Sequence, residues 1–302
     1  MSNKIFTVSV GIPAYNEEAN IKKLLLNILS QKEDGFTLKE IIVASDGSVD
    51  GTEKEVLSVP DKRIRLLAFK ERVGQAIRQN EIVKEVSGDL VLLLNADILL
   101  VGDNFIAELV KPFNQIENLA LASPLFRPTK PKTFFERIIN YSVSMKDYMF
   151  ESWNKGENLF MCVGRTRMFS SSFIKSFSWP GALSEDAFSY LKCLEMGLRF
   201  IPVLSAKVLF RSPSNFKDHV RQSSRFLNGS EIMKQFFPEQ LVDESYSIPL
   251  VIRLKTISLY FFKNPLFFSA YMGILLYSKI YSYKKTTRAN VWKVATSSKT
   301  IQ

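Results

Sequence analysis

The strongest constraint on this chain is the regular alternation of strand-like and helix-like segments through its first 123 residues. Short apolar runs with the length of buried strands lie at residues 7–12, 38–44, 64–68, 89–94 and 119–123. Between them, segments with helical patterns lie at residues 16–29, 50–57, 74–86 and 104–115. Strands that alternate with helices predict an α/β fold with a mostly parallel sheet and helices on both faces.

The rest of the chain is less regular, and its elements are predicted from local signals. Asn16 can N-cap the first helix, with Glu17 and Glu18 near the positive end of the helix dipole. Gly197 can end a helix that begins at Glu185. The other elements expected here are helices at residues 134–150 and 217–235 and a strand within residues 161–170.

Several charged side chains lie where an α/β sheet binds its ligands. Asp46 and Asp97 directly follow predicted strands, and such sheets bind ligands beyond the carboxyl ends of their strands. Glu185 and Asp186 begin a predicted helix, and Arg225 lies in a later one. Each has an ordinary explanation alone, as part of a turn, a helix start or a solvated surface. Their combination and order favour a single functional site.

Six motifs around these residues resemble the family 2 glycosyltransferases, whose nucleotide-sugar-binding fold is called GT-A. The resemblance runs from residue 8 to about residue 229. Two motifs stand in place of the family's Asp-x-Asp (95–97) and Gln-x-x-Arg-Trp (222–226). The others are residues 10–18, 45–52, 74–80 and the Glu-Asp pair at 185–186. The resemblance implies a Rossmann-like GT-A domain that transfers a sugar from a nucleotide-diphospho-sugar.

The resemblance also assigns residues to donor binding, with a UDP-sugar favoured. A carboxylate such as Asp46 can accept hydrogen bonds from a base N–H or a ribose hydroxyl. The side chains that the resemblance places around the donor are those of Pro13, Tyr15, Glu17, Asp46, Arg78, Asn95, Gln222 and Phe226.

The catalytic roles that follow from the resemblance concern a metal, a base and a cation. Asp97 is the expected ligand of Mn²⁺ or Mg²⁺, since these cations prefer oxygen and often use only one or two protein carboxylates beside phosphates. Asp186, with Glu185 beside it, would be the general base on the acceptor hydroxyl. Arg225 would contact the diphosphate as the leaving group gains charge. One-step attack on the donor inverts the anomeric carbon.

Three residues depart from the family pattern. Ser45 replaces the first aspartate of the pair that usually precedes the glycine. Asn95 replaces the first aspartate of Asp-x-Asp, and supplies a carbonyl oxygen without a charge. Phe226 keeps an aromatic face but lacks the indole N–H of tryptophan. A degenerate sugar-nucleotide-binding protein without catalytic activity is therefore an alternative.

Four other residues have two interpretations each. Trp179 could stack on a sugar or pack in the core. Arg165 or Arg167 could bind an acceptor phosphate, or be a surface cation. His219 could face an acceptor, or be a polar helix residue. The chain has two cysteines and one histidine, which exclude a disulfide framework and a histidine-rich metal site.

The net charge of +10 is concentrated near the carboxyl terminus. Residues 245–302 contain nine lysines and arginines and no acidic residue, whereas residues 1–244 are close to neutral. This division predicts a catalytic domain at 1–244 and a basic, aromatic helical region at 245–302. A nucleic-acid-binding protein is disfavoured, because its basic residues would be spread over the body of the chain.

The basic region is predicted to form two short helices, broken at Asn264 and Pro265, that lie on a membrane. Lys284, Lys285 and Arg288 would meet anionic head groups. A peripheral or monotopic enzyme at the cytoplasmic face, near a glycan or lipid-linked acceptor, is the resulting hypothesis. A helix pair that only closes the catalytic domain, or one broken spanning helix, is also compatible with the pattern.

A nucleotidyltransferase of similar fold is the remaining alternative. Such an enzyme would need a phosphate-binding loop rich in glycine and basic residues after its first strand. Residues 13–18 are acidic instead, which argues against this class.

Overall fold

The computed structural model describes residues 4–181, 184–226 and 229–284. Its strands are β1 (Phe6–Ala14), β2 (Phe36–Asp46), β3 (Ile64–Phe69), β4 (Leu90–Leu94), β5 (Ile98–Leu100), β6 (Leu119–Pro128), β7 (Thr166–Ser170) and β8 (Arg199–Phe210). Its α-helices are α1 (Ile21–Leu29), α2 (Thr52–Leu57), α3 (Gln75–Glu85), α4 (Phe105–Val110), α5 (Phe134–Ser152), α6 (Ser171–Ile174), α7 (Glu185–Glu195), α8 (Phe216–Phe226), α9 (Gly229–Met233), α10 (Glu239–Tyr246), α11 (Leu250–Lys263) and α12 (Pro265–Lys284). The predicted alternation of strands and helices up to α4 is confirmed.

The strands form one sheet in the order β3-β2-β1-β4-β7-β6-β8-β5. The first four are parallel neighbours, and β6 is parallel to β8. The strand β7 runs antiparallel between β4 and β6, and β5 is antiparallel to β8. The predicted α/β fold is confirmed, with two antiparallel strands added to the parallel set.

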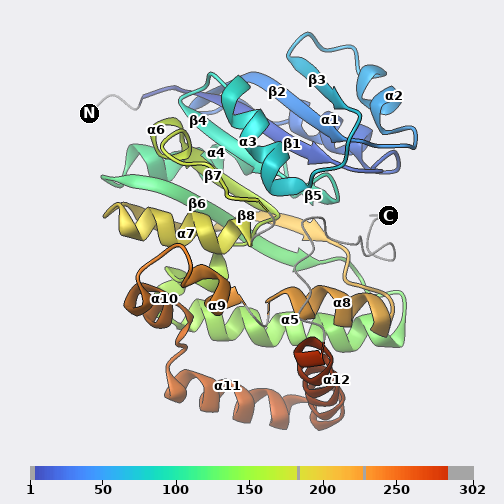
Figure 1. The fold of residues 1–302 in the computed structure, drawn as a ribbon, viewed down its shortest axis with the longest axis vertical. Helices are drawn as coiled ribbons and strands as arrows, with labels where there is room; N and C mark the ends of the chain where they lie inside the picture. Colours follow the sequence, from blue (N-terminus) through green and yellow to red (C-terminus); the bar gives the residue numbers. More distant parts are fainter. Residues whose placement is uncertain (1–3, 182–183, 227–228, 285–302) are drawn as a thin grey trace.

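Both faces of the sheet are covered, which explains the continuous apolar runs of its central strands. Along β2, Ile41 and Val43 face a core shared with α1 and α4. The alternate residues, Ile42 and Ala44, face a second core shared with α3 and α7. Figure 1 shows the sheet between these helices in the upper part of the molecule. Because β1, β2 and β4 are parallel, the loops that follow them meet at one edge of the sheet.

A layer of helices closes the other end of the molecule (Figure 1). Helix α5 packs on α11 and α12, and the buried side chains between them are Ile138, Met145, Tyr260 and Tyr271. The break that was predicted at Asn264 and Pro265 is confirmed, since α11 ends at Lys263 and α12 begins at Pro265. Within the described residues, no helix is both long and apolar enough to cross a bilayer. The side chain of Lys284 and all of residues 285–302 lie outside the described part of the chain.

Two local predictions are wrong. Asn16 does not cap the first helix: its φ is +53°, and α1 begins only at Ile21, after Asn20. The segment between β1 and α1 is held by the neighbouring loop instead, because the Glu17 N–H donates to Thr52 Oγ1 at 2.7 Å. The strand expected at residues 161–170 is shorter than predicted, because a 3₁₀ turn ends at Met161 and a turn at residues 164–165 precedes β7, which begins at Thr166. Strands β5 and β8 were not predicted.

Candidate active site

Asp46, at the end of β2, is fully engaged by protein donors. Its carboxylate accepts hydrogen bonds from the N–H groups of Val73 and Gly74, both at 2.9 Å. It also accepts one from Arg78 Nε at 2.8 Å, and both side chains of this ion pair are 6% exposed. The guanidinium of Arg78 lies over the ring of Phe69, 3.7 Å from its centroid. Asp46 and Arg78 therefore fix the segment between β3 and α3, and their contact with a nucleoside stays a prediction.

The loop after β1 brings three predicted donor-binding residues beside this segment. Pro13 and Tyr15 are half-buried, and Tyr15 lies under the guanidinium of Arg72, 3.9 Å from the ring centroid. Glu17 is buried, and its Oε2 accepts a hydrogen bond from Asn20 at 2.9 Å. The aromatic face of Tyr15 is thus covered on one side by a cation from a different loop.

The metal motif follows β4 and is less tightly held. Asp97 is half-buried, and its closest cation is Arg165, with Nη1 3.7 Å from Oδ2. The Arg165 guanidinium rests on the ring of Phe210, 4.5 Å from the centroid. The backbone of Arg165 also holds the motif, because its carbonyl accepts the Asn95 N–H at 2.8 Å. The Asp97 carboxylate therefore keeps oxygen lone pairs for another ligand.

The base motif begins α7 and reaches the same place. Asp186 accepts a hydrogen bond from the Gly164 N–H at 3.1 Å, and one from the Ala187 N–H at 2.8 Å. Both acids of the motif lie in the first turn of the helix. A side chain at position 164 would meet Glu185 Oε1 at 2.7 Å and Asp186 Oδ2 at 3.3 Å, so a larger residue here would displace the Glu185 carboxylate.

Gln75 joins the two motifs and was not singled out from the sequence. Its Nε2 donates to Asn95 Oδ1 and to Glu185 Oε1, each at 2.9 Å. It is the first residue of α3 and follows Gly74, whose φ is +102°. Nothing local marks it as functional, since its partners lie 20 and 110 positions away along the chain.

The structure buries two residues that the sequence analysis offered as ligand contacts. Trp179 is 2% exposed, and its Nε1 donates to the Glu185 carbonyl at 3.0 Å and to Ser189 Oγ at 3.1 Å. Arg167 is 0% exposed and donates to the same carbonyl at 2.6 Å. Neither side chain has a free face for a sugar or phosphate, so the sugar-stacking role of Trp179 is corrected to packing beneath the base motif.

The last motif lies on α8. Gln222 is half-buried, whereas the side chains of Arg225 and Phe226 lie outside the part of the chain that the structure describes. His219 is buried one turn earlier, with Nε2 3.1 Å from Ser223 Oγ. Burial, assisted by Lys146, lowers the pKa of His219 to about 4. His219 is therefore neutral at pH 7.

The residues present suit a divalent cation held jointly with a diphosphate. Within the described residues, no group of three or more His, Cys, Asp or Glu side chains is arranged to hold a metal alone. Mg²⁺ and Mn²⁺ commonly bind through one or two carboxylates and complete their shells with phosphate oxygens and water. The half-buried Asp97 carboxylate, with only a long contact to Arg165, fits that mode of binding.

Known proteins are similar to parts of this chain. The family model described as Glycosyl transferase family 2 matches residues 9–177. The UDP-Glc:alpha-D-GlcNAc-diphosphoundecaprenol beta-1,3-glucosyltransferase WfgD of Escherichia coli is 31% identical over 98 residues, which are 32% of this chain and 38% of that protein. A dolichyl-phosphate beta-glucosyltransferase of Trichomonas vaginalis is 35% identical over 124 residues, covering 36% of this chain and 38% of the relative. The chain thus spans well under half the length of both relatives.

A solved structure supports the fold over nearly the whole chain. The mannosyltransferase PcManGT of Pyrobaculum calidifontis, in complex with GDP-Man and Mn²⁺, superposes with a TM-score of 0.67 at 19% identity. The match covers 93% of this chain and 87% of that one. This likeness confirms the GT-A fold, and the family model covers more than half of the sequence. The chain belongs to the family 2 glycosyltransferases.

Proposed function

We propose that this protein transfers a sugar from a nucleoside-diphosphate sugar to a hydroxyl group of a glycan or lipid-linked acceptor, with inversion at the anomeric carbon. The observation that carries the proposal is the convergence of the metal motif and the base motif. Gln75 connects Asn95 to Glu185 through two 2.9 Å hydrogen bonds, which supports a single site that contains Asp97 and Asp186. A transferase needs both groups within reach of one donor.

The donor side of the reaction uses the loops after β1, β2 and β4. The nucleoside would lie against Tyr15, with Asp46 and Arg78 fixing the loop beside it. Asp97 would hold Mn²⁺ or Mg²⁺ together with the diphosphate, and this cation would offset the charge that develops on the leaving group. Gln222, Arg225 and Phe226 are the expected further contacts of the donor.

The acceptor side of the reaction uses Asp186. Its carboxylate receives the proton of the attacking hydroxyl while the hydroxyl oxygen forms a bond to the anomeric carbon. The bond from that carbon to the diphosphate breaks in the same step, and the nucleoside diphosphate leaves with the electron pair. The Gly164 N–H donates to this carboxylate and holds it at the start of α7.

A donor screen tests this proposal. Hydrolysis of UDP-, GDP- and dTDP-sugars is measured with Mn²⁺, and one donor class should turn over. The Asp97→Ala variant should lose this turnover, whereas the control Asp103→Ala should keep it, because Asp103 is an exposed acid paired with Lys32. Turnover that survives Asp97→Ala would refute the metal assignment. Asp186→Asn should keep donor binding and lose transfer, and transfer at the normal rate would reject Asp186 as the base.

The helical end of the molecule supports the further proposal of peripheral attachment to the cytoplasmic face of a membrane. Helices α11 and α12 expose apolar side chains to solvent, while the described residues from 245 onward include lysines and an arginine but no acid. The exposed apolar side chains are Leu250, Val251, Leu254, Ile257, Leu259, Phe261, Phe262, Leu266, Met272, Leu276, Tyr277 and Ile280. Such a surface matches an interfacial helix pair on anionic lipid.

Vesicle co-sedimentation of the full chain tests the attachment. The Leu254→Glu and Phe262→Glu variants should lose binding to phosphatidylglycerol vesicles. The control Leu57→Glu should bind normally, because Leu57 is equally exposed but lies on α2, at the other end of the molecule. Equal sedimentation of all three variants would exclude α11 as a membrane contact.

A further inference from the structure

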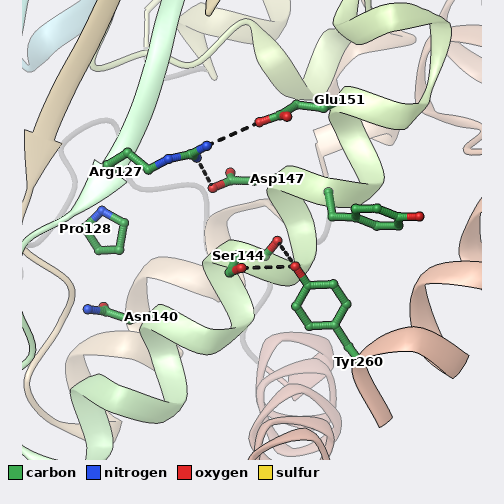
Figure 2. A pocket seen from close by; sticks show the side chains of 8 residues that line it. Arg127, Pro128, Asn140, Ser144, Asp147, Glu151 and Tyr260 are labelled. Carbon is green, nitrogen blue, oxygen red and sulfur yellow. Dashed lines mark hydrogen bonds and ion pairs between the residues drawn. The ribbon is translucent and has the colours of Figure 1, made fainter. Parts of the chain in front are cut away.

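A cavity of about 320 Å³ lies between the end of β6, helix α5 and helix α11. Figure 2 shows Arg127 at the end of β6 facing Asp147 and Glu151 of α5, with Tyr260 of α11 next to Ser144. It is lined by Arg127, Pro128, Asn140, Ser144, Asp147, Tyr148, Glu151 and Tyr260. None of these residues belongs to the motifs of the active site. The volume is at the low end for small-ligand pockets and suits one or two sugar residues.

The charges in the cavity exclude some ligands. Arg127 Nη1 donates to Asp147 Oδ2 at 2.5 Å, and Nη2 lies 3.5 Å from Glu151 Oε1 (Figure 2). The single cation is thus already opposed by two carboxylates, and the cavity has a formal charge of −1. A phosphate group would be repelled by the carboxylates. A purely apolar ligand would have to bury them without partners, which is costly.

Some polar side chains in the cavity wall already donate hydrogen bonds within the protein, and others can still accept one. Tyr260 donates to the Ser144 carbonyl at 2.7 Å, and Asn140 donates to the Thr129 carbonyl at 2.9 Å, so these two side chains form fixed walls. Glu151 Oε1 is buried and has no hydrogen-bond partner. A carboxylate has about four lone-pair sites, so Asp147 and Glu151 together can accept several more hydrogens.

The cavity is connected to the active site through adjacent strands. Pro128, in its wall, is paired with Phe210 in the register of β6 and β8. The Phe210 ring carries the Arg165 guanidinium at 4.5 Å, and Arg165 lies 3.7 Å from Asp97. Strand β8 therefore lies between the cavity wall at Pro128 and β5, which begins directly after the expected metal ligand Asp97.

We propose that this cavity is a subsite for a sugar residue of the acceptor, remote from the hydroxyl that reacts. The ligand class follows from the lining, because sugar hydroxyls donate to carboxylates while a tyrosine ring such as that of Tyr148 packs on the apolar face of the sugar. The proposal rests on the proposed function, since it assigns the acceptor of that transferase. It makes the acceptor a glycan of at least two residues.

Binding of free disaccharides to the full chain tests the subsite. A panel of hexose and N-acetylhexosamine disaccharides is titrated while saturation-transfer NMR records contact with the protein. At least one should bind saturably, and Glu151→Met should weaken it about tenfold, because a buried acceptor for sugar hydroxyls is lost. Asp147→Asn, which preserves shape, should weaken it less. The control Glu157→Met removes an acid paired with Arg199 outside the cavity and should leave binding unchanged.

Three results would overturn the subsite. One is the absence of saturable binding by every disaccharide. Another is binding that Glu151→Met and Asp147→Asn leave unchanged in folded protein, as checked by circular dichroism. The third is displacement of a bound disaccharide by inorganic phosphate or putrescine, which would assign the cavity to an ion. Donor hydrolysis is measured on the same variants: its absence in the wild-type protein rejects the transferase, whereas hydrolysis without disaccharide binding rejects only the subsite.

Discussion

The end of β2 and the loop after β4 both carry an aspartate at the same edge of the sheet, but the protein holds the two side chains in opposite ways. Asp46 accepts three hydrogen bonds from protein donors and is 6% exposed. Asp97 has one long contact with a cation and is 21% exposed. Asp46 at the end of β2 therefore serves as a fixed support for the segment between β3 and α3, whereas the loop after β4 keeps a carboxylate available to a ligand.

Replacing each aspartate by asparagine should separate these roles. Asp46→Asn breaks the buried ion pair with Arg78 and is expected to lower the free energy of unfolding by about 3 kcal/mol. Asp97→Asn should change it by less than about 0.5 kcal/mol, because no buried partner is lost. Urea unfolding at neutral pH measures both values. Equal losses of unfolding free energy would show that the two aspartates are held alike.

The arginines at the start of β7 extend the comparison. Arg167 donates to the Glu185 carbonyl and to Ser189 Oγ beneath the base motif, and it is completely buried. Arg167→Met should cost about 2 kcal/mol of stability, because these acceptors lose a charged donor. Arg165→Met should cost under about 0.5 kcal/mol, because Arg165 is partly exposed and its guanidinium makes only a long contact with Asp97 and a contact with the Phe210 ring, which a methionine side chain can partly replace.

Replacing Arg165 also tests whether the metal binds at Asp97. Its positive charge competes with a divalent cation for Asp97, so Arg165→Met should tighten Mn²⁺ binding in the absence of donor. Isothermal titration with Mn²⁺ measures this change apart from catalysis. Unchanged Mn²⁺ affinity would place the metal away from Asp97 or Arg165.

The strands and helices that support the site were largely predictable from the sequence. The contacts that join its motifs were not. Strands such as β2 are continuous apolar runs, so their assignment needs only local information. In β8, Pro202 interrupts the run, and exposed residues such as Lys207 follow it. Its strand character depends on pairing with β5 and β6. The motif acids were found by resemblance, but their partners depend on tertiary contacts.

Gln75 illustrates that dependence, and its replacement tests whether the two motifs act together. Gln75→Leu removes both hydrogen bonds that join Asn95 to Glu185, and we expect kcat for transfer to fall about tenfold through misplacement of the base. KM for the donor should change less than kcat, and the control Gln240→Leu, on the surface of α10, should change neither. A pure loss of stability with normal kcat would reduce Gln75 to a structural residue.

The smallest expected effect concerns His219 and Asp147 at the helical end, whose pKa values are shifted in opposite directions. Burial lowers the pKa of His219 to about 4, with Lys146 adding to the shift. The unfolded chain therefore binds a proton at His219 before the folded chain does, and stability is lost as pH falls from 6.5. Burial raises the pKa of Asp147 to about 6, with Glu151 opposing Arg127, so the folded chain binds that proton first and stability is gained on acidification from about pH 6.

These two contributions largely cancel in the wild-type protein, and single variants should reveal them. Asp147→Asn should make acidification from pH 6.5 to about 5.5 cost roughly 1 kcal/mol more than in wild type, because the loss at His219 is then unopposed. His219→Gln should have the opposite slope, since only the gain at Asp147 remains. Urea unfolding across this range measures both, and carboxylates that do not contact the substituted residue contribute equally to the three proteins. Parallel pH profiles would mean that both side chains are more accessible to water in solution than their burial in this structure requires.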